Sequence, residues 1–186
     1  MPTVSLQRHP SSPDDGVRGI EVRVRRSAEG VVALTYVLEG DLSCIRIPAP
    51  TSPGIAHRLW EHTCCEGFVA RDGASAYQEF NFSPSGEWAS YGFRAYREVG
   101  SIGDEALAPA IAVRRTADRL ELDARISLPA LSPQYARVAL WIGLAAVIEA
   151  DDAALSYWSL HHPPGQADFH HADARTLRLE PPTREW

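Results

Sequence analysis

The sequence predicts an all-β domain of about ten short antiparallel strands, arranged as a sandwich or a barrel. Alternation of apolar and polar residues with a period of two is the dominant pattern, turn signals recur between the alternating runs, and a helical apolar repeat is hard to find. The chain has 186 residues, of which 45% are hydrophobic and 23% are charged, as in ordinary globular proteins. No interior boundary is visible, so we expect one domain over residues 1–186.

Two strands are expected on either side of a short turn at residues 28–30. Between Ile20 and Val24, apolar residues alternate with Glu or Arg, which indicates a strand with one buried face. The run from Val31 to Leu38 is richer in apolar and β-branched residues, so we expect it to be a more central strand.

A second pair of strands is expected to meet at Ser83–Gly86. Ser, Pro and Gly occupy the first, second and fourth positions of this tetrapeptide, which suits a type I turn. Aromatic residues flank the turn on both sides: Phe80, Phe82, Trp88, Tyr91 and Phe93.

The clearest strand runs from Leu120 to Leu128, where apolar residues alternate with Glu, Asp, Arg and Ser. A short polar link at 116–119 joins it to Ile111–Val113, so we expect a hairpin there. Apolar positions of the expected strands should form the core, in particular Phe80, Phe82, Leu122, Ile126, Leu140 and Ile142.

Composition disfavours several classes of protein. A net charge of −6 and a pI near 5.6 argue against a general nucleic-acid binder. All basic residues apart from histidine are arginine, which removes lysine-based Schiff-base and P-loop chemistry. The longest dense apolar stretch, Val138 to Ala150, contains Gly143 and Glu149, so no membrane partner is expected. The N-terminal residues lack the pattern of a signal peptide, and we expect a cytoplasmic protein.

The three cysteines, Cys44, Cys64 and Cys65, are expected to be free thiols. An odd number with two adjacent residues is no disulfide framework, and no CxxC spacing indicates zinc. Because successive strand residues face opposite sides, Cys64 and Cys65 should not share a face.

The densest polar cluster lies at 156–171, where Pro163, Pro164 and Gly165 impose a loop. His162, Asp168 and His170 could converge there, with Asp168 orienting an imidazole and Trp158 providing an apolar wall. One interpretation is a metal site, but the spacing matches neither HExxH nor HxxxH, and we expect no metal or other cofactor. The alternatives are a hydrogen-bonded structural loop and a ligand-contacting loop.

Two acidic residues lie inside otherwise apolar strands, Glu66 in the run 59–69 and Glu79 in the run 77–82. A buried carboxylate is unfavourable unless it has a partner, and Arg94 or Arg97 could supply one. Hydrogen bonding to a ligand is a second interpretation, and general acid and base catalysis, as in glycosidases, is a third.

Tryptophans offer a further candidate feature. We expect them to be mostly core residues, with one or two forming a sugar-stacking surface if they are exposed in a cleft. The four in question are Trp60, Trp88, Trp141 and Trp158.

Five motifs, read in order, resemble the small bacterial DOMON-like proteins, which are related to family 9 carbohydrate-binding modules. They are W-x-x-T-C-x-E-x-F (60–68), Y-x-E-F-N-F-S-P-S-G-x-W (77–88), A-Y-R (95–97), S-Y-W-S-L (156–160) and H-P-P-G-x-x-D-F-H-H (162–171). The resemblance implies a two-sheet antiparallel β-sandwich of jelly-roll type, in agreement with the alternation of period two. It also implies that the ligand is a sugar or haem, as in other members of this superfamily.

The sole methionine, Met1, leaves no interior residue for the Met/His haem site of the cytochrome-like relatives, so we expect no haem. We expect instead a non-catalytic domain that binds a carbohydrate or related small polar ligand. Its expected ligand contacts are Trp158, His162, Asp168, His170 and Glu66. The alternatives are a structural or protein-interaction domain without a small ligand, and a metal-dependent hydrolase around His162, Asp168 and His170. GxSxG, GxxxxGK[ST] and GxGxxG motifs are all missing from the sequence.

Overall fold

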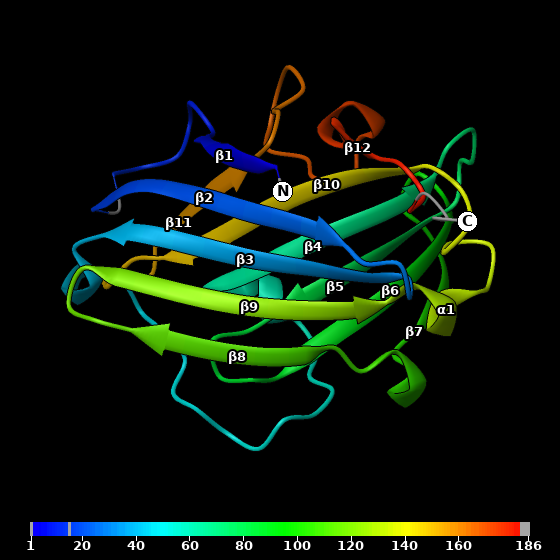
Figure 1. The fold of residues 1–186 in the computed structure, drawn as a ribbon. Helices are drawn as coiled ribbons and strands as arrows, with labels where there is room; N and C mark the ends of the chain where they lie inside the picture. Colours follow the sequence, from blue (N-terminus) through cyan, green and yellow to red (C-terminus); the bar gives the residue numbers. More distant parts are fainter. Residues whose placement is uncertain (1, 15, 183–186) are drawn as a thin grey trace.

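The computed structural model describes residues 2–14 and 16–182, which form antiparallel strands arranged in two layers (Figure 1). The strands within these ranges are β1 (Thr3–Arg8), β2 (Val17–Arg26), β3 (Val31–Gly40), β4 (Cys64–Arg71), β5 (Tyr77–Phe82), β6 (Trp88–Ala95), β7 (Glu98–Ile102), β8 (Ala110–Arg115), β9 (Arg119–Ser127), β10 (Leu140–Glu149), β11 (Leu155–Ser159) and β12 (Leu177–Leu179). Helical structure there is limited to α1 (Leu128–Leu131) and the 3₁₀ turns η1 (Leu42–Cys44), η2 (Leu59–Glu61), η3 (Glu105–Leu107) and η4 (Ala172–Ala174). No described helix is long and apolar enough to span a bilayer.

One continuous path of hydrogen-bonded strands runs through both layers. The front sheet consists of β2, β3, β9 and β8, and the back sheet of β7, β6, β5, β4, β10 and β11, with β12 also paired to β10 (Figure 1). Strand β1 joins the two sheets, because Thr3–Leu6 pair with β2 and Gln7 and Arg8 pair with β11. The predicted antiparallel sandwich is confirmed, with twelve strands in the described ranges rather than about ten. Short strands account for the difference: β7, for example, is exposed along its whole length and shows no clear apolar alternation.

The main core lies between the sheets. The six residues predicted for it from alternation are confirmed as core, each 0–1% exposed. At Gly67 on β4 a Cβ atom would lie 3.3 Å from Leu34 Cδ1 on β3, so the absence of a side chain permits close approach of the layers. Tyr36 on β3 donates its hydroxyl to the carbonyl oxygen of Glu66 on β4 at 2.7 Å, which satisfies a polar group inside this core.

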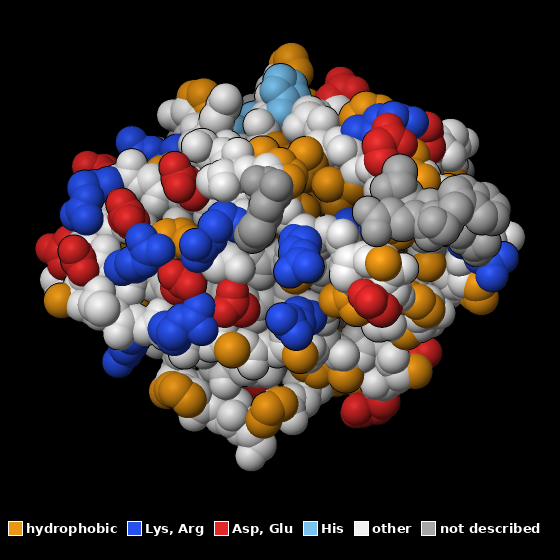
Figure 2. Space-filling view, viewed as in Figure 1, with side chains coloured by type: hydrophobic (Ala, Val, Ile, Leu, Met, Phe, Trp, Pro, Cys, Tyr) orange, Lys and Arg blue, Asp and Glu red, His pale blue; other side chains and the backbone are white. Residues whose placement is uncertain are grey.

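The outer face of the front sheet is a solvated surface on which arginines and acidic residues intermingle (Figure 2). Arg119 on β9, for instance, forms ion pairs with Glu39 at 2.8 Å and Glu121 at 3.0 Å. Exposed pairs of this kind contribute little stability each, typically about 0–1 kcal/mol. The alternating charges explain why these strands were identifiable from sequence, since their polar face is exposed to water.

The back sheet, in contrast, is buried on both faces along its central strands β4 and β10. Its inner face belongs to the main core, and its outer face forms a second apolar cluster that includes Phe68, Tyr77 and Phe93. As predicted, Cys64 and Cys65 face opposite sides: Cys64 lies in the outer cluster and Cys65 in the main core, and all three cysteines are free. This second buried face positions the candidate site.

Candidate functional site

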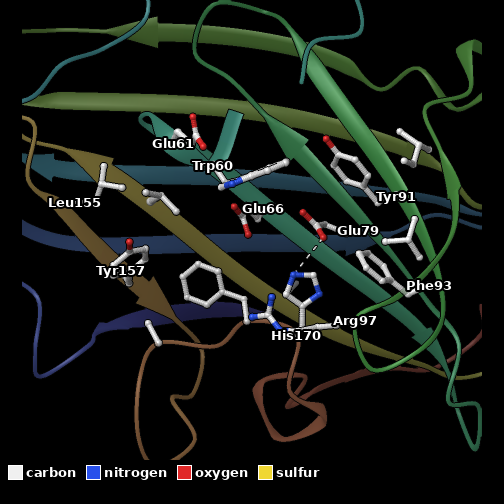
Figure 3. Close-up of a pocket in the computed structure, with 15 residues that line it drawn as sticks. Trp60, Glu61, Glu66, Glu79, Tyr91, Phe93, Arg97, Leu155, Tyr157 and His170 are labelled. Atoms are coloured by element: carbon white, nitrogen blue, oxygen red, sulfur yellow. Dashed lines mark ion pairs between the residues drawn. The ribbon is translucent and has the colours of Figure 1, made fainter. Parts of the chain in front are cut away.

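A cleft of about 620 Å³ opens on the outer face of the back sheet (Figure 3). Strands β4, β5, β6, β10 and β11 form its floor, the turn η2 and the edge strand β7 form two walls, and the loop between β11 and η4 forms a third. Aromatic, acidic and basic side chains share its lining: Trp60, Glu61, Glu66, Glu79, Tyr91, Phe93, Arg97, Val99, Ile102, Val147, Leu155, Tyr157, Ala167, Phe169 and His170.

Trp60 is the most exposed aromatic residue of the cleft, with 40% of its surface accessible. It lies on η2, where Leu59 is buried in the outer cluster and anchors the turn to the sheet. Arg58 begins the turn in the left-handed region at φ 61° and binds the carboxylate of Glu61 through Nε and Nη2, at 2.9 and 2.6 Å. The indole packs edge-on against Tyr91 at 5.8 Å between ring centroids. Trp60 is therefore held with an apolar surface open to the cleft.

A second aromatic wall comes from Tyr157 and Phe169. Tyr157 faces outward from β11 and contacts the ring of Phe169 at 6.1 Å between centroids. The loop that carries Phe169 begins with Pro163, Pro164 and Gly165, and Gly165 adopts a φ of +110° that favours glycine. A hydrogen bond to His9 fixes the loop backbone, with Nε2 of His9 3.1 Å from the carbonyl oxygen of Gly165. The predicted loop is confirmed, and it folds back over the outer face of the sheet.

Two buried carboxyl groups form the polar part of the floor. In the β4–β5 ladder Glu66 lies opposite Asn81 and Glu79 lies opposite Phe68, so the two acids are diagonal neighbours on one face. Glu79 accepts a hydrogen bond from Asn81 Nδ2 at 2.9 Å. Glu66 is 3% exposed, and its carboxyl group has no hydrogen-bond or ion-pair partner among the described residues. Figure 3 shows both carboxyl groups directed into the cleft.

Burial raises the pKa of both acids. Loss of solvation raises the pKa of Glu66 well above its usual range, and the neighbouring Glu79 raises it further. Burial also raises the pKa of Glu79 to about 7, although the hydrogen bond from Asn81 and the charge of Arg97 oppose the increase. The cleft floor can therefore both donate and accept hydrogen bonds near neutral pH.

His170 is positioned by the aromatic cluster. Its Nδ1 lies 2.9 Å from the Tyr77 hydroxyl, and its ring packs edge-on against Phe68 and Phe93. Its Nε2 lies 3.6 Å from Glu79 Oε2, the contact drawn in Figure 3. Burial lowers the pKa of His170 to about 4, with a further decrease from Arg97, so the imidazole is neutral at pH 7. At that pH the contact with Glu79 is not an ion pair.

Arg97 brings a cation to the rim from the turn between β6 and β7. Its Nη2 binds Asp168 Oδ1 at 2.8 Å, and Asp168 Oδ2 accepts from the Tyr96 hydroxyl at 2.6 Å. Partial burial raises the pKa of Asp168, but the hydrogen bonds from Tyr96 and Arg97 outweigh it and bring the pKa below its usual value. Asp168 therefore acts as an ionised clamp that orients Arg97.

Of the five side chains predicted to contact a ligand, Glu66 and His170 line this cleft and the other three do not. Asp168 binds Arg97 at the rim, and it orients no imidazole, since its hydrogen-bond partners are Arg97, Tyr96 and the backbone N–H of His170. His162 lies apart from it, with Nε2 2.8 Å from the carbonyl oxygen of Gln7 and its ring against His9. The predicted convergence of His162, Asp168 and His170 is therefore wrong, because the loop directs the three side chains to different places.

Trp158 faces the interior instead of the cleft. It is 6% exposed, belongs to the main core, and donates its indole N–H to Ser156 Oγ at 3.0 Å. The cleft aromatic on this strand is its neighbour Tyr157, because successive residues of β11 point to opposite faces. Alternation along the strand shows that the side chains of Tyr157 and Trp158 lie on opposite faces of the sheet, but not which of the two faces a cleft.

The expected arginine partners of the buried acids are engaged elsewhere. Arg94 pairs with Glu98 at 3.1 Å, and the ion pair recorded for Arg97 is with Asp168. No group of three or more His, Cys, Asp or Glu side chains within residues 2–14 and 16–182 is arranged to hold a metal ion.

Comparison with known proteins finds structures with a similar fold but no matching curated sequence. No family model matches the chain, and no curated protein sequence matches it. A proposed carbohydrate-binding protein from Bacteroides uniformis is similar in structure, with a TM-score of 0.68 and 16% identity over 93% of this chain and 83% of that one. A family 9 carbohydrate-binding module from Caldicellulosiruptor kristjanssonii, solved with cellotriose, has a TM-score of 0.61 and 10% identity over 98% of this chain and 84% of that one. The chain thus has a fold like that of family 9 modules.

Proposed function

We propose that the protein binds a carbohydrate in the cleft on the outer face of the back sheet, without transforming it. One observation carries the proposal: the exposed Trp60 and the buried carboxyl group of Glu66 face the same cleft (Figure 3). That carboxyl group has no hydrogen-bond or ion-pair partner among the described residues. Support also comes from the fold, since the two similar structures named above are described as carbohydrate-binding.

A sugar has the two properties that this lining requires. The apolar face of a pyranose ring can stack on Trp60 or Tyr157, which removes apolar surface from water. Its hydroxyl groups can donate to and accept from the protonated carboxyl groups of Glu66 and Glu79, and can accept from the guanidinium of Arg97. A buried carboxyl group without a partner is unfavourable, so a hydroxyl that pairs with it contributes more than one that replaces a hydrogen bond to water.

The two alternative functions have less support in the described residues. A domain that binds another protein would be expected to expose a flat apolar patch. The lining residues instead surround a concave cleft that contains buried polar groups. A metal-dependent hydrolase would need His162, Asp168 and His170 together, and these face different places. The cytoplasmic location and the single-domain organisation remain predictions.

Removing the Trp60 side chain should weaken sugar binding at least about tenfold, or about 1.4 kcal/mol, because a ring face loses its stacking partner. The measurement is titration calorimetry of Trp60→Ala against soluble oligosaccharides found to bind the wild type, with cellotriose among those screened. Trp141→Ala is the matched control, since Trp141 also faces outward from the back sheet but lies outside the cleft, where it binds Asp72. Equal affinity of both variants and the wild type would place the site elsewhere, and failure of every sugar to bind would overturn the function.

A further inference from the structure

The cleft floor has an excess of acidic groups. Glu66 and Glu79 are 3% and 5% exposed, lie diagonally on adjacent strands, and direct their carboxyl groups into one cleft (Figure 3). The polar contacts recorded for them are the Asn81 amide and the neutral His170 imidazole, both to Glu79. No arginine within the described ranges forms an ion pair with either acid.

Each nearby cation already has its own partner. Arg97 at the rim is paired with Asp168 at 2.8 Å, so this unit carries no net charge. Arg58 is paired with Glu61 at 2.6 Å on η2. Arg175 lies beyond the aromatic cluster, stacked on the Tyr77 ring at 4.6 Å from the centroid, with Nη1 bonded to the carbonyl oxygen of His170. The acids of the floor therefore have no counter-ion in contact among residues 2–14 and 16–182.

We propose that the ligand supplies this positive charge, and that the cleft selects sugars bearing a protonated amino group, such as glucosamine units. This inference rests on the proposed function and names the class of sugar. An ammonium group has three donors and no acceptor, which matches two carboxylates that can only accept once they are ionised. Hydrogen bonds between ionised partners are about twice as strong as neutral ones, and burial protects them from screening by salt.

The aromatic lining favours the same ligand. Trp60, Tyr91 and Tyr157 surround the space above the acids, and a cation within about 6 Å of an aromatic face is attracted by the ring electrons. A neutral sugar would use these rings for stacking alone. An amino sugar would use them for stacking and for stabilising its charge.

Binding of an ammonium group should also release protons. At neutral pH both acids hold protons in the free protein to a large extent, because burial raises their pKa values. A cation placed between them favours ionisation, so one or more protons would pass to the buffer. A neutral sugar changes the charge balance of the floor little and should release few protons.

The test compares three trisaccharides by titration calorimetry at about pH 6, below the ordinary pKa of an amine. They are the β-1,4-linked trimer of glucosamine, its fully N-acetylated form and cellotriose. We expect the glucosamine trimer to bind at least about tenfold more tightly than the other two. We also expect its apparent enthalpy to change between buffers of different ionisation enthalpy, as proton release requires.

Glu66→Gln and Glu79→Gln are the matched variants, because each keeps the side-chain shape and removes the charge. The preference for the glucosamine trimer over the two neutral trisaccharides should fall to less than about threefold in each variant, and circular dichroism checks the fold. If cellotriose or the acetylated trimer binds the wild type as tightly as the glucosamine trimer, the inference is wrong and the proposed function stands. If none of a broad set of sugars binds, both are wrong. The wild-type comparison decides the matter even if a variant fails to fold.

Discussion

Replacing Phe80 with alanine is expected to lower the free energy of unfolding by about 3–5 kcal/mol. Phe80 is 0% exposed in the main core, and its ring lies parallel to that of Phe82, at 6.3 Å between centroids and 5° between planes. The truncation removes buried apolar surface and leaves a cavity that the two hydrogen-bonded sheets cannot collapse to fill. Urea unfolding followed by circular dichroism or tryptophan fluorescence gives the change.

Phe80→Leu is the control for this substitution, because it retains most of the apolar volume and should cost clearly less than the alanine variant. A loss below about 1 kcal/mol for Phe80→Ala would contradict the position of this residue in the core, since a surface site has that cost.

Between pH 4.5 and 7, Glu79→Gln is expected to gain about 3 kcal/mol of stability relative to the wild type. Burial raises the pKa of Glu79 from its ordinary 4.5 to about 7, so in this range the folded state keeps a proton that the unfolded state has lost. Raising the pH therefore destabilises the folded wild type by about 1.4 kcal/mol for each unit across the window. Glutamine does not ionise, so the stability of the Glu79→Gln variant lacks this decrease with rising pH.

The wild-type profile alone would not show this trend clearly. The pKa of His170 is lowered by burial from 6.5 to about 4, and a lowered pKa on a base contributes in the opposite direction. The stability that the neutral His170 contributes to the folded state is fully present above pH 6.5 and is lost as the pH falls toward 4. The difference between the wild type and Glu79→Gln cancels this shared contribution, so urea unfolding of both proteins at several pH values is the measurement. Parallel stability curves would show that Glu79 is not buried as described.

Much of the strand content was predictable from local patterns. The alternation from Leu120 to Leu128 predicted β9 because one face of that strand contacts water, and the turn at Ser83–Gly86 is confirmed by a hydrogen bond from the Gly86 N–H to the Ser83 carbonyl oxygen at 3.0 Å. Turn chemistry and alternation act between near neighbours, so they are visible in the sequence. The buried acid Glu66 was visible for the same reason, since a charge inside an apolar run is anomalous wherever the run is placed.

Local patterns in the sequence thus predicted an antiparallel β-structure and six of its core residues, and they singled out Glu66 and Glu79 as buried acids that require a partner. Which face of the back sheet holds a cleft depends on the tertiary structure. Tyr157 and Trp158 are equivalent in sequence terms, and the pairing of β11 with β10, together with the loop that returns over the outer face, places Tyr157 in the cleft and Trp158 in the core. The same long-range arrangement separates His162 from His170. Strand pairing across large sequence separations depends on the packing of the whole chain, and no local pattern encodes it.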